Sequence, residues 1–377
     1  MGFFGEKNLG FGMMRLPITT PGDATSINIE LLCEMVDYYL SKGFTYFDTA
    51  WLYHGFKSEC AAKEALVRRH PRESFTLATK LHGGFFSTKE EPDQIFAEQL
   101  KKTGVEYFDY YLLHDIGEDH YKKYTELDCF NWLMKKKEQG LVKHIGFSYH
   151  DGAELLDKVL TEHPEMEFVQ LQINYLDWES AGVQSRKCYE VAVKHGKQVI
   201  VMEPVKGGTL AKVPESAEKL FKDYAPDMSV PSWAIRFAAS HENVGMVLSG
   251  MSNMEQLRDN VSYMENFKPM TDEEKAIVMQ AVDAINASIA IPCTGCAYCV
   301  EGCPMSIPIP AYFSLYNLDL QESKTKGWCP QGEYYTRMTM TKAKASECIA
   351  CGQCEGVCPQ HLPIIEHLKQ VAEHFEK

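Results

Sequence analysis

The sequence predicts an α/β fold in which a closed (β/α)8 barrel is followed by a small, largely helical domain. Between Gly10 and Asn266, short apolar, β-branched or aromatic runs alternate with longer segments of helical period. Eight such runs, each followed by a helix within about 260 residues, are typical of a closed parallel barrel. From Pro292 onward the composition shifts to Cys, Gly and Pro, which indicates a second domain. A chain of 377 residues has room for both.

The barrel strands are expected in the short apolar runs. They are Leu9–Met14, Tyr46–Thr49, Phe75–Lys80, Tyr107–His114, His144–Ser148, Phe168–Asn174, Val199–Glu203 and Gly245–Leu248. The helices between them include Ile29–Lys42, Glu59–Arg69, Asp93–Lys102 and Cys129–Gln139. An open, doubly wound sheet is the competing arrangement. It is expected to carry a Gly-rich turn after its first strand, and Gly10-Phe-Gly12 lacks the third glycine.

The domain boundary is predicted from the last helix of the barrel. This helix, Thr271–Ala287, leads to Pro292 and the change in composition. We therefore assign residues 1–290 to the barrel and residues 291–377 to the second domain.

Two copies of one cysteine pattern indicate the chemistry of the second domain. They run from Cys293 to Pro304 and from Cys348 to Pro359, each with two, two and three residues between successive cysteines. Three closely spaced thiolates bind one [4Fe-4S] cluster, and the fourth, followed by proline, reaches the other cluster. The pattern therefore predicts two [4Fe-4S] clusters. By this crossed rule the ligands are Cys293, Cys296, Cys299 and Cys358 for one cluster, and Cys348, Cys351, Cys354 and Cys303 for the other.

Structural zinc sites are the alternative interpretation of these cysteines. Zinc needs four ligands in two pairs, and it has no use for a third cysteine at this spacing. The similarity of the two copies continues past the ligands, which indicates a duplicated unit. The spacer between them is longer than in a compact bacterial ferredoxin, and Ala311–Leu320 within it is expected to be helical. The module resembles the helical two-cluster ferredoxin domains that supply electrons to flavoenzymes.

Composition restricts the cellular compartment and the kinds of partner expected for this protein. Eight of the 13 cysteines belong to the two motifs and must stay reduced, which indicates a reducing compartment. Met1–Pro17 lacks the features of a signal peptide, and no apolar run is long enough to span a bilayer. We therefore expect a cytoplasmic protein without a membrane partner. The net charge of −14 argues against nucleic acid as a partner, and it fits either an ordinary soluble surface or docking onto a basic protein.

Four polar residues fall where predicted barrel strands end, which is where such barrels carry their reactive groups. Asp48 closes the second strand, Tyr53 follows it by five positions, Lys80 ends the third and His114 ends the fourth. A phenol is a poor acid at neutral pH, so a neighbouring cation is needed to stabilise its phenolate form. Lys80 can supply that charge if Asp48 holds it, and His114 can donate a hydrogen bond to a carbonyl oxygen.

Several runs between residues 9 and 266 resemble a known family. They are Gly10-Phe-Gly-Met-Met-Arg-Leu-Pro17, Phe47-Asp-Thr-Ala-Trp-Leu-Tyr53, Thr79-Lys80, Asp109-Tyr-Tyr-Leu-Leu-His114, Gly140-Leu-Val-Lys-His-Ile-Gly-Phe-Ser148 and Gln172-Ile-Asn-Tyr175. In content and order these runs are similar to the aldo-keto reductases, which are TIM barrels. The resemblance implies that hydride passes from a nicotinamide to the carbonyl carbon of a small-molecule substrate. It also implies that Tyr53 is the general acid, that Lys80 and Asp48 tune it, and that His114 orients the carbonyl.

The nicotinamide site is where the sequence departs from this family. Of the residues that hold the nicotinamide amide there, Ser148 and Gln172 remain, but Tyr149 replaces an asparagine. Met202 and Glu203 stand where the family often has a tyrosine that stacks on the ring. The resemblance leaves NAD(H) and NADP(H) both open.

The phosphate end of the cofactor site also differs from the family. After the eighth strand the family's reductases usually carry a lysine and an arginine for the 2′-phosphate. Here the cofactor contacts expected from the resemblance are Gly250 and Met251, through their backbone amides, with Gln256 and Asn260.

Three histidines near the predicted loop mouths, His54, His82 and His150, are candidates for the substrate pocket, although histidines on loops are more often solvated or capping residues. Cys329 lies inside the cluster domain, and its spacing does not assign it a role.

The two predicted halves handle electrons differently, since nicotinamide gives up two electrons together and each cluster passes one at a time. A bound or partner flavin is the usual converter. Three functions follow: an iron-sulfur oxidoreductase linked to a ferredoxin or flavoprotein donor, a plain NADP-dependent carbonyl reductase with structural or redox-sensing clusters, or a non-catalytic electron-transfer subunit. The four residues at the strand ends argue against the third. The substrate and the direction of electron flow stay open.

Overall fold

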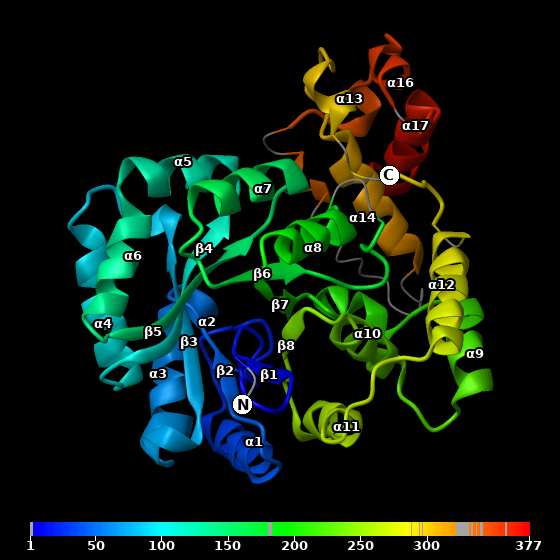
Figure 1. Cartoon of the computed structure of the whole chain (residues 1–377). Coiled ribbons are helices and arrows are strands. Elements are labelled where there is room, and N and C mark those ends of the chain that lie inside the picture. The colour runs from blue at the N-terminus through cyan, green and yellow to red at the C-terminus, as the bar shows by residue number, and fades with distance from the viewer. Residues whose placement is uncertain are drawn as a thin grey trace. The chain divides into compact units, whose positions relative to one another are not determined.

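The computed structural model describes residues 3–179, 183–287, 289–293, 295, 297–321, 332, 335–336, 338–339, 342–358 and 360–377. The chain divides into two compact units (Figure 1). The first contains Met1–Glu179, Val183–Lys212 and Ala225–Val278, and the second contains Val213–Tyr224 and Met279–Lys377. Cys296 and Cys329 lie outside the described residues.

Eight parallel strands close into a barrel in sequence order, β1 to β8, with helices around it (Figure 1). The strands are β1 (Leu9–Gly12), β2 (Tyr46–Asp48), β3 (Thr76–His82), β4 (Phe108–Ile116), β5 (Val142–Tyr149), β6 (Phe168–Gln172), β7 (Gln198–Met202) and β8 (Val244–Ser249). The predicted barrel is confirmed, and each predicted strand overlaps an observed one. β3 and β4 continue for two residues past Lys80 and His114, so these side chains project from within strands.

The helices of the first unit lie between the strands and after β8. They are α1 (Ile29–Ser41), α2 (Tyr53–Phe56), α3 (Ser58–Ala62), η1 (Lys63–Val67), η2 (Arg72–Ser74), η3 (Gly83–Phe85), α4 (Glu91–Thr103), α5 (Glu118–Glu126), α6 (Cys129–Glu138), α7 (Ala153–Glu162), α8 (Ser185–Lys194), η4 (Lys206–Ala211), α10 (Val230–Ala239), α11 (Met254–Met264) and the start of α12 (Asp272–Ala287). Local signals define their ends. Asn28 caps α1 by accepting a hydrogen bond from the Leu31 amide, and Gly104 ends α4 in the left-handed conformation.

An apolar layer fills the barrel interior. Its buried members are Phe4, Tyr46, Ala78, Tyr110, Leu112, Phe168, Ile200, Met246 and Leu248. Side chains alternate between the two faces of a strand, so residues two positions apart point the same way. Asp48, Lys80 and His114 each follow a member of this layer by two residues. They therefore point into the barrel one layer closer to the carboxyl ends of the strands.

Two aromatic residues at the N-terminus close the other end of the barrel. Phe4 is buried and packs against Phe168 and Tyr110, whose hydroxyl donates a 2.9 Å hydrogen bond to the Phe3 carbonyl oxygen. Gly245 makes room for this packing, because a Cβ there would come within 2.4 Å of the Phe4 ring. Aromatic side chains thus fill the end of the barrel opposite the polar residues.

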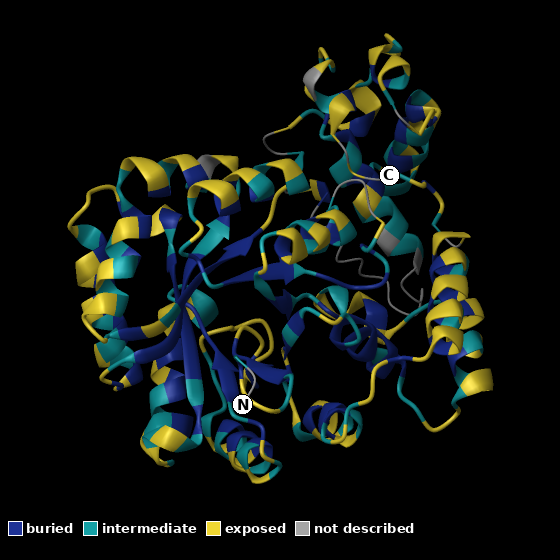
Figure 2. Cartoon of the chain, in the orientation of Figure 1, coloured by how far each residue is buried: buried dark blue, intermediate teal, exposed yellow. Residues whose placement is uncertain are grey.

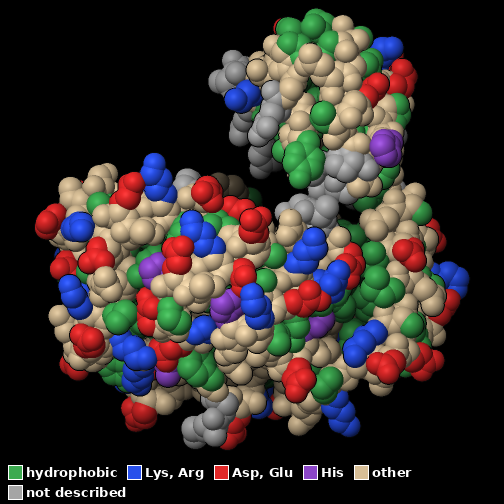
Figure 3. All heavy atoms as spheres, turned by 45° about the horizontal axis from the view of Figure 1, so that its top comes forward, with side chains coloured by type: hydrophobic (Ala, Val, Ile, Leu, Met, Phe, Trp, Pro, Cys, Tyr) green, Lys and Arg blue, Asp and Glu red, His purple; other side chains and the backbone are tan. Residues whose placement is uncertain are grey.

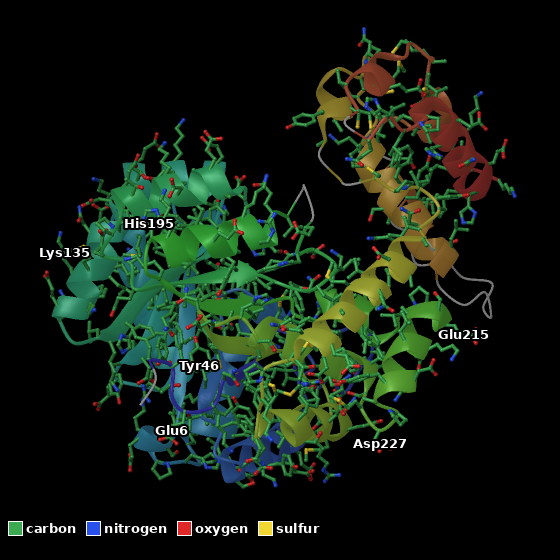
Figure 4. All side chains as sticks on the ribbon, turned by 45° about the vertical axis from the view of Figure 1, so that its right-hand side comes forward. Glu6, Tyr46, Lys135, His195, Glu215 and Asp227 are labelled. Carbon is green, nitrogen blue, oxygen red and sulfur yellow. The ribbon has the colours of Figure 1, made fainter. Side chains whose placement is uncertain are left out.

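Burial follows this plan within the barrel unit. The strands are buried and the outward helix faces are exposed in Figure 2. In Figure 4, Tyr46 lies within the barrel and Lys135 lies on the outer side of α6. Acidic and basic side chains are interspersed over the face of the barrel unit seen in Figure 3. Among the described residues, no helix combines the length and apolar character needed to cross a membrane.

The second unit is helical and internally repeated. Its helices are α9 (Glu215–Tyr224), the end of α12, α13 (Tyr298–Glu301), α14 (Ile309–Gln321), η5 (Ala345–Glu347), α16 (Gln353–Gly356) and α17 (Ile364–Phe375). Its buried core includes Ile307, Ile309 and Phe313 from one copy and Ile364 and Leu368 from the other. The predicted helix Ala311–Leu320 lies within α14.

The duplication extends to the backbone conformation. Left-handed residues occur at matching places in the two copies, namely Gly295 and Ala350, Ala297 and Gly352, and Ser306 and His361. A positive φ is unfavourable for residues other than glycine, so its repetition at corresponding sites shows that both copies trace the same path. At these described positions the two copies therefore share a backbone conformation as well as a cysteine spacing.

Candidate functional site

Asp48, Tyr53, Lys80 and His114 come together at the carboxyl ends of β2, β3 and β4. Asp48 ends β2, Lys80 and His114 lie within β3 and β4, and Tyr53 begins α2, the short helix after β2. The register places Asp48 beside Ala78, and the Tyr53 ring lies 5.9 Å from the His114 ring. The structure thus assembles the four residues that the sequence analysis singled out.

Lys80 is the centre of this group. Its ammonium is fully buried and donates hydrogen bonds to Asp48 Oδ1 at 2.5 Å, to the Thr49 carbonyl oxygen at 2.8 Å and to the Tyr53 hydroxyl at 3.3 Å. Three donors with three acceptors satisfy an ammonium completely. The cation is therefore held between the carboxylate and the phenol.

Charge pairing decides the ionisation of Lys80. Burial lowers the pKa of Lys80, but the carboxylate of Asp48 and the phenol of Tyr53 outweigh burial, and the net direction is upward. Lys80 is therefore a permanent cation at neutral pH. For Asp48, burial raises the pKa and Lys80 opposes that rise. An ion pair removed from water in this way is costly unless both partners are present.

The Tyr53 phenol keeps its proton in this environment. Burial raises the pKa of Tyr53, Lys80 lowers it, and Asp48 and Glu203 raise it, so that the net direction is upward. The sequence analysis expected stabilisation of the phenolate by Lys80. That stabilisation is present, but burial and the two carboxylates exceed it, so the resting state is the protonated phenol.

His114 is neutral at this position. Burial, followed by the charge of Lys80, holds the pKa of His114 well below its usual range. Its Nδ1 atom is buried and has no hydrogen-bond partner among the described residues. A neutral imidazole keeps one N–H, so it can donate a hydrogen bond to an oxygen in the site without carrying charge.

A buried polar network behind the site fixes the backbone of Lys80. Gln99 on α4 donates to the Lys80 carbonyl oxygen at 3.0 Å and to Glu59 at 2.8 Å, and it accepts from the Tyr111 hydroxyl at 2.6 Å. The Thr79 hydroxyl donates to the same Glu59 oxygen at 2.7 Å. Networks of this kind are rigid when their members are satisfied. The strand segment that carries Lys80 is therefore held from the outside of the barrel.

A cavity of about 600 Å³ opens above this group. Tyr53 and His114 line one part of it, and Gln256, Asp259 and Asn260 of α11 line another. A volume of this size suits an organic cofactor and a small substrate better than a substrate alone.

Two residues predicted to hold the nicotinamide amide do not line this cavity. The Ser148 hydroxyl accepts a 2.8 Å hydrogen bond from the Asp115 amide, and Gln172 donates to Asp177 at 2.9 Å. Tyr149, which replaces the family's asparagine, donates its hydroxyl to the Gly152 carbonyl oxygen. These side chains support loops around the site.

Gln170 lines the cavity instead, and the sequence analysis missed it. It lies on β6, two residues before Gln172, so both face the barrel interior, with Gln170 one layer deeper. Gln170 is 3% exposed, and its Oε1 has no hydrogen-bond partner among the described residues. Buried amide oxygens are normally paired, so this atom points to a ligand with an N–H or O–H donor. The sequence does carry a signal for Gln170, because it stands two residues before Gln172 in the run Gln170-Leu-Gln172.

Some of the predicted cofactor contacts after β8 line the cavity and others do not. Gly250, Gln256 and Asn260 line the cavity, whereas Met251 is buried and is not among the residues that line it. Asn260 donates to the Ser249 hydroxyl at 2.8 Å, and Gln256 accepts from the Ser252 amide at 2.8 Å. These contacts hold the loop after β8 against the start of α11.

Only two of the three loop histidines line the cavity. His82 and His150 line the cavity, together with Met202 and Glu203. His54 instead accepts a 3.0 Å hydrogen bond from the Leu16 amide and contacts the Ala24 carbonyl oxygen through Nδ1 at 2.6 Å. His54 therefore ties down the loop after β1.

In the second unit, the described motif cysteines surround two separate small cavities. Cys293, Cys299 and Cys358 line one cavity. Cys303, Cys348, Cys351 and Cys354 line the other. The remaining lining side chains are mostly apolar, such as Ile309, which borders both cavities. Each group contains the described cysteines that the crossed rule assigns to one cluster. Each cavity, lined mostly by apolar side chains, fits a cluster ligated by sulfur.

The sequence also matches models of two known domains. The model of the aldo/keto reductase family matches residues 8–283, and that of a 4Fe-4S dicluster domain matches residues 292–362. The barrel and its site define an oxidoreductase. The chain belongs to the aldo/keto reductase family and carries a 4Fe-4S dicluster domain toward its C-terminal end.

Known relatives share the barrel. The uncharacterized oxidoreductase YqkF of Bacillus subtilis is 23% identical over 300 residues, which cover 71% of this chain and 90% of that protein. The holo form of aldo-keto reductase AKR11C1 from Bacillus halodurans superposes with a TM-score of 0.58 at 24% identity, over 73% of this chain and 91% of its own. An aldo/keto reductase from Klebsiella pneumoniae in complex with NADP and acetate superposes with a TM-score of 0.58 at 16% identity, over 72% of this chain and 90% of its own. These structures share the fold.

Proposed function

We propose that the barrel reduces the carbonyl group of a small molecule, with Tyr53 as the proton donor. The observation that carries the proposal is the position of the Lys80 ammonium, which contacts both Asp48 and the Tyr53 hydroxyl at the floor of the cavity. A docking scaffold has no need of a buried ion pair next to a phenol in a cavity. Buried pairs of this kind cost stability and are more readily explained by catalysis.

The chain's own residues divide the chemistry as follows. A nicotinamide bound in the cavity would supply a hydride to the carbonyl carbon. Tyr53 donates its proton to the carbonyl oxygen, so a C–H and an O–H bond form while the C=O double bond becomes a single bond. The phenolate left on Tyr53 is stabilised by Lys80, and Asp48 keeps Lys80 in place. Neutral His114 donates a hydrogen bond to the carbonyl oxygen as negative charge develops there.

The cavity fits a nicotinamide cofactor in part. The unpaired Gln170 Oε1 offers an acceptor for a carboxamide N–H, and Gly12 and Gly250 line the same cavity. Tyr149 and Glu203 depart from the family pattern, as the sequence analysis noted. We keep NADP(H) and NAD(H) as alternatives, and comparison of kcat/KM for the two distinguishes them.

Substitution of Tyr53 by phenylalanine tests the assignment of the proton donor. We expect Tyr53→Phe to lower kcat by about two to four orders of magnitude, because it removes the acid while leaving the ring. Tyr107→Phe is the matched control, since Tyr107 precedes β4 at the opposite end of the barrel. Steady-state kinetics with small aldehydes and ketones measure both. Full activity of Tyr53→Phe would rule out this mechanism.

For the second unit we propose two [4Fe-4S] clusters with crossed ligands. The described cysteines at the two cavities supply three and four of the eight thiolates, and Cys296 is proposed as the fourth ligand of the first cluster. Each cluster passes one electron at a time. We also propose that the boundary between the two sequence domains lies between residues 290 and 291, since the two domain matches end at 283 and begin at 292. The compact second unit of the structure begins earlier, at Met279, and also includes Val213–Tyr224.

We further propose that electrons from these clusters reach the barrel site and that a ferredoxin or flavoprotein is the donor. The partial nicotinamide contacts beside two complete cysteine motifs support this proposal. The second candidate is a plain reductase with structural or redox-sensing clusters, which the match to the family supports.

Anaerobic stopped-flow spectroscopy separates these two functions. Protein with reduced clusters is mixed with carbonyl or enone substrates, with and without NADPH, while cluster absorbance is followed. Oxidation of the clusters by substrate without NADPH supports the linkage, and a flavin released on denaturation would identify a converter. Clusters that stay reduced through many turnovers would leave the plain reductase.

A further inference from the structure

Three side chains beside the proposed catalytic group form a cluster that the mechanism above does not use. His82 ends β3, Asp115 lies near the end of β4 and His120 lies in α5. One ligand atom from each lies within 4.8 Å of the other two. Asp115 Oδ2 is 3.8 Å from His82 Nε2. Such separations are close to those between neighbouring ligands of one metal ion.

The backbone already orients two of these side chains. Asp115 has a φ of 58°, and its amide donates a hydrogen bond to the Ser148 hydroxyl at 2.8 Å. His120 Nδ1 lies 2.7 Å from the Asp115 carbonyl oxygen. Metal-binding imidazoles are commonly oriented by such a bond from one ring nitrogen to a carbonyl and bind the ion through the other nitrogen, which for His120 is Nε2. The His120 ring also packs on Gly83, where a Cβ would come within 3.0 Å of it.

His82 requires one rearrangement to act as a ligand. The Gly84 amide donates to His82 Nδ1 at 2.9 Å, so the ring proton of neutral His82 lies on Nε2. Ligation through Nε2 moves that proton to Nδ1, and the Gly84 amide must then find another acceptor. Gly84 is exposed, so water can take this role. The cost is one exchanged hydrogen bond at the surface.

We propose that His82, Asp115 and His120 bind one divalent transition-metal ion, with Zn²⁺ as the best match. Two imidazoles and one carboxylate suit zinc or ferrous iron, whereas magnesium and calcium prefer oxygen ligands alone. His82 and Asp115 line the same cavity as Tyr53, and the His82 ring lies 5.1 Å from that of His114. An ion at this site is therefore reachable from the cavity and can accept an oxygen ligand of the substrate. The site does not depend on the proposed reductase function.

Zinc K-edge X-ray absorption of protein with fully loaded clusters tests the proposal. The zinc edge is separate from the iron edge, and zinc in a cysteine site would show sulfur at about 2.3 Å. We expect one zinc per chain, bound by nitrogen and oxygen at about 2.0 to 2.2 Å with the scattering pattern of imidazole. Zinc bound only through sulfur would overturn the proposal.

Equilibrium dialysis with radioactive zinc assigns the ligands. Asp115→Asn and His120→Gln should each weaken zinc binding at least about 10-fold. His150→Gln is the matched control, because His150 also lines the cavity but does not belong to the cluster, and it should bind zinc like the wild type. Iron content and circular dichroism verify the fold of each variant. Wild-type affinity in both cluster variants, or equal loss in His150→Gln, would contradict the assignment.

Discussion

At the scale of single residues, some of the site could be predicted from the sequence and some could not. Asp48, Tyr53, Lys80 and His114 were predictable because each lies at the end of, or just after, a short strand run that the alternation of apolar segments locates. The sequence did not show which of Gln170 and Gln172 lines the cavity. They lie on one strand and one face, and only the depth of the cavity and the bond from Gln172 to Asp177 distinguish them.

Substitution of the two glutamines tests which of them contacts the proposed nicotinamide cofactor. Gln170→Ala should raise the Kd of the nicotinamide cofactor about 2- to 10-fold, because one hydrogen bond is worth about 0.5–1.5 kcal/mol net. Gln172→Ala should leave this Kd nearly unchanged. Anaerobic fluorescence titration with NADPH and NADH measures both. A larger effect at Gln172 would restore the contact expected from the sequence.

At the scale of elements, the sequence located every strand but misplaced some ends. β3 and β4 extend beyond Lys80 and His114 because their last residues still pair with neighbouring strands, for example His82 with His114. Polar residues near a strand end give no signal of where pairing stops. The same uncertainty hid the cluster of His82, Asp115 and His120, whose members lie on three different elements.

Glu167, the residue before β6, contacts α6 and β5 at the closed end of the barrel. It accepts hydrogen bonds from Lys137 of α6 at 2.7 Å and from the Ile145 amide of β5 at 2.9 Å, and it contacts His144 at 3.1 Å. Burial raises the pKa of Glu167, but these partners outweigh burial and lower it to about 2. The side chain is 23% exposed, so the ionised form is only partly screened by water.

The pH dependence of stability follows from this depressed pKa. The contribution of Glu167 is complete above its unfolded pKa of 4.5 and is lost as the pH falls toward 2. We expect Glu167→Gln to lower the free energy of unfolding by about 2 kcal/mol at pH 7 and by progressively less in acid. Urea unfolding of the wild type and the variant at several pH values measures the difference. Exposed Glu138→Gln is the control, and a constant difference across this range would contradict the linkage.

At the scale of the whole molecule, the sequence predicted two chemistries on one chain. The barrel followed from periodicity and the clusters from cysteine spacing, since both are repeating local signals. The substrate is not predictable in this way, because the loops and the cavity that select it do not repeat.

Iron and sulfide analysis tests the cluster assignment for the whole chain. Anaerobically purified protein should contain about eight iron and eight sulfide, and Cys348→Ser should lose about half of each, because one cluster is affected first. Cys60→Ser is the control, since Cys60 is an exposed cysteine outside both motifs. Stoichiometric zinc without acid-labile sulfide would instead indicate structural zinc sites.

The repeated loops of the second unit bear on how such a domain could arise. Each cysteine-lined cavity draws thiols from both copies, so neither copy encloses a cavity alone. A peptide with a single copy would therefore have to pair with another molecule of itself to complete a cluster. Gene duplication and fusion would then convert that homodimer into one chain, and the spacer would replace the subunit interface. Two fragments cut within the spacer, one with each copy, should accordingly still assemble clusters when they are mixed.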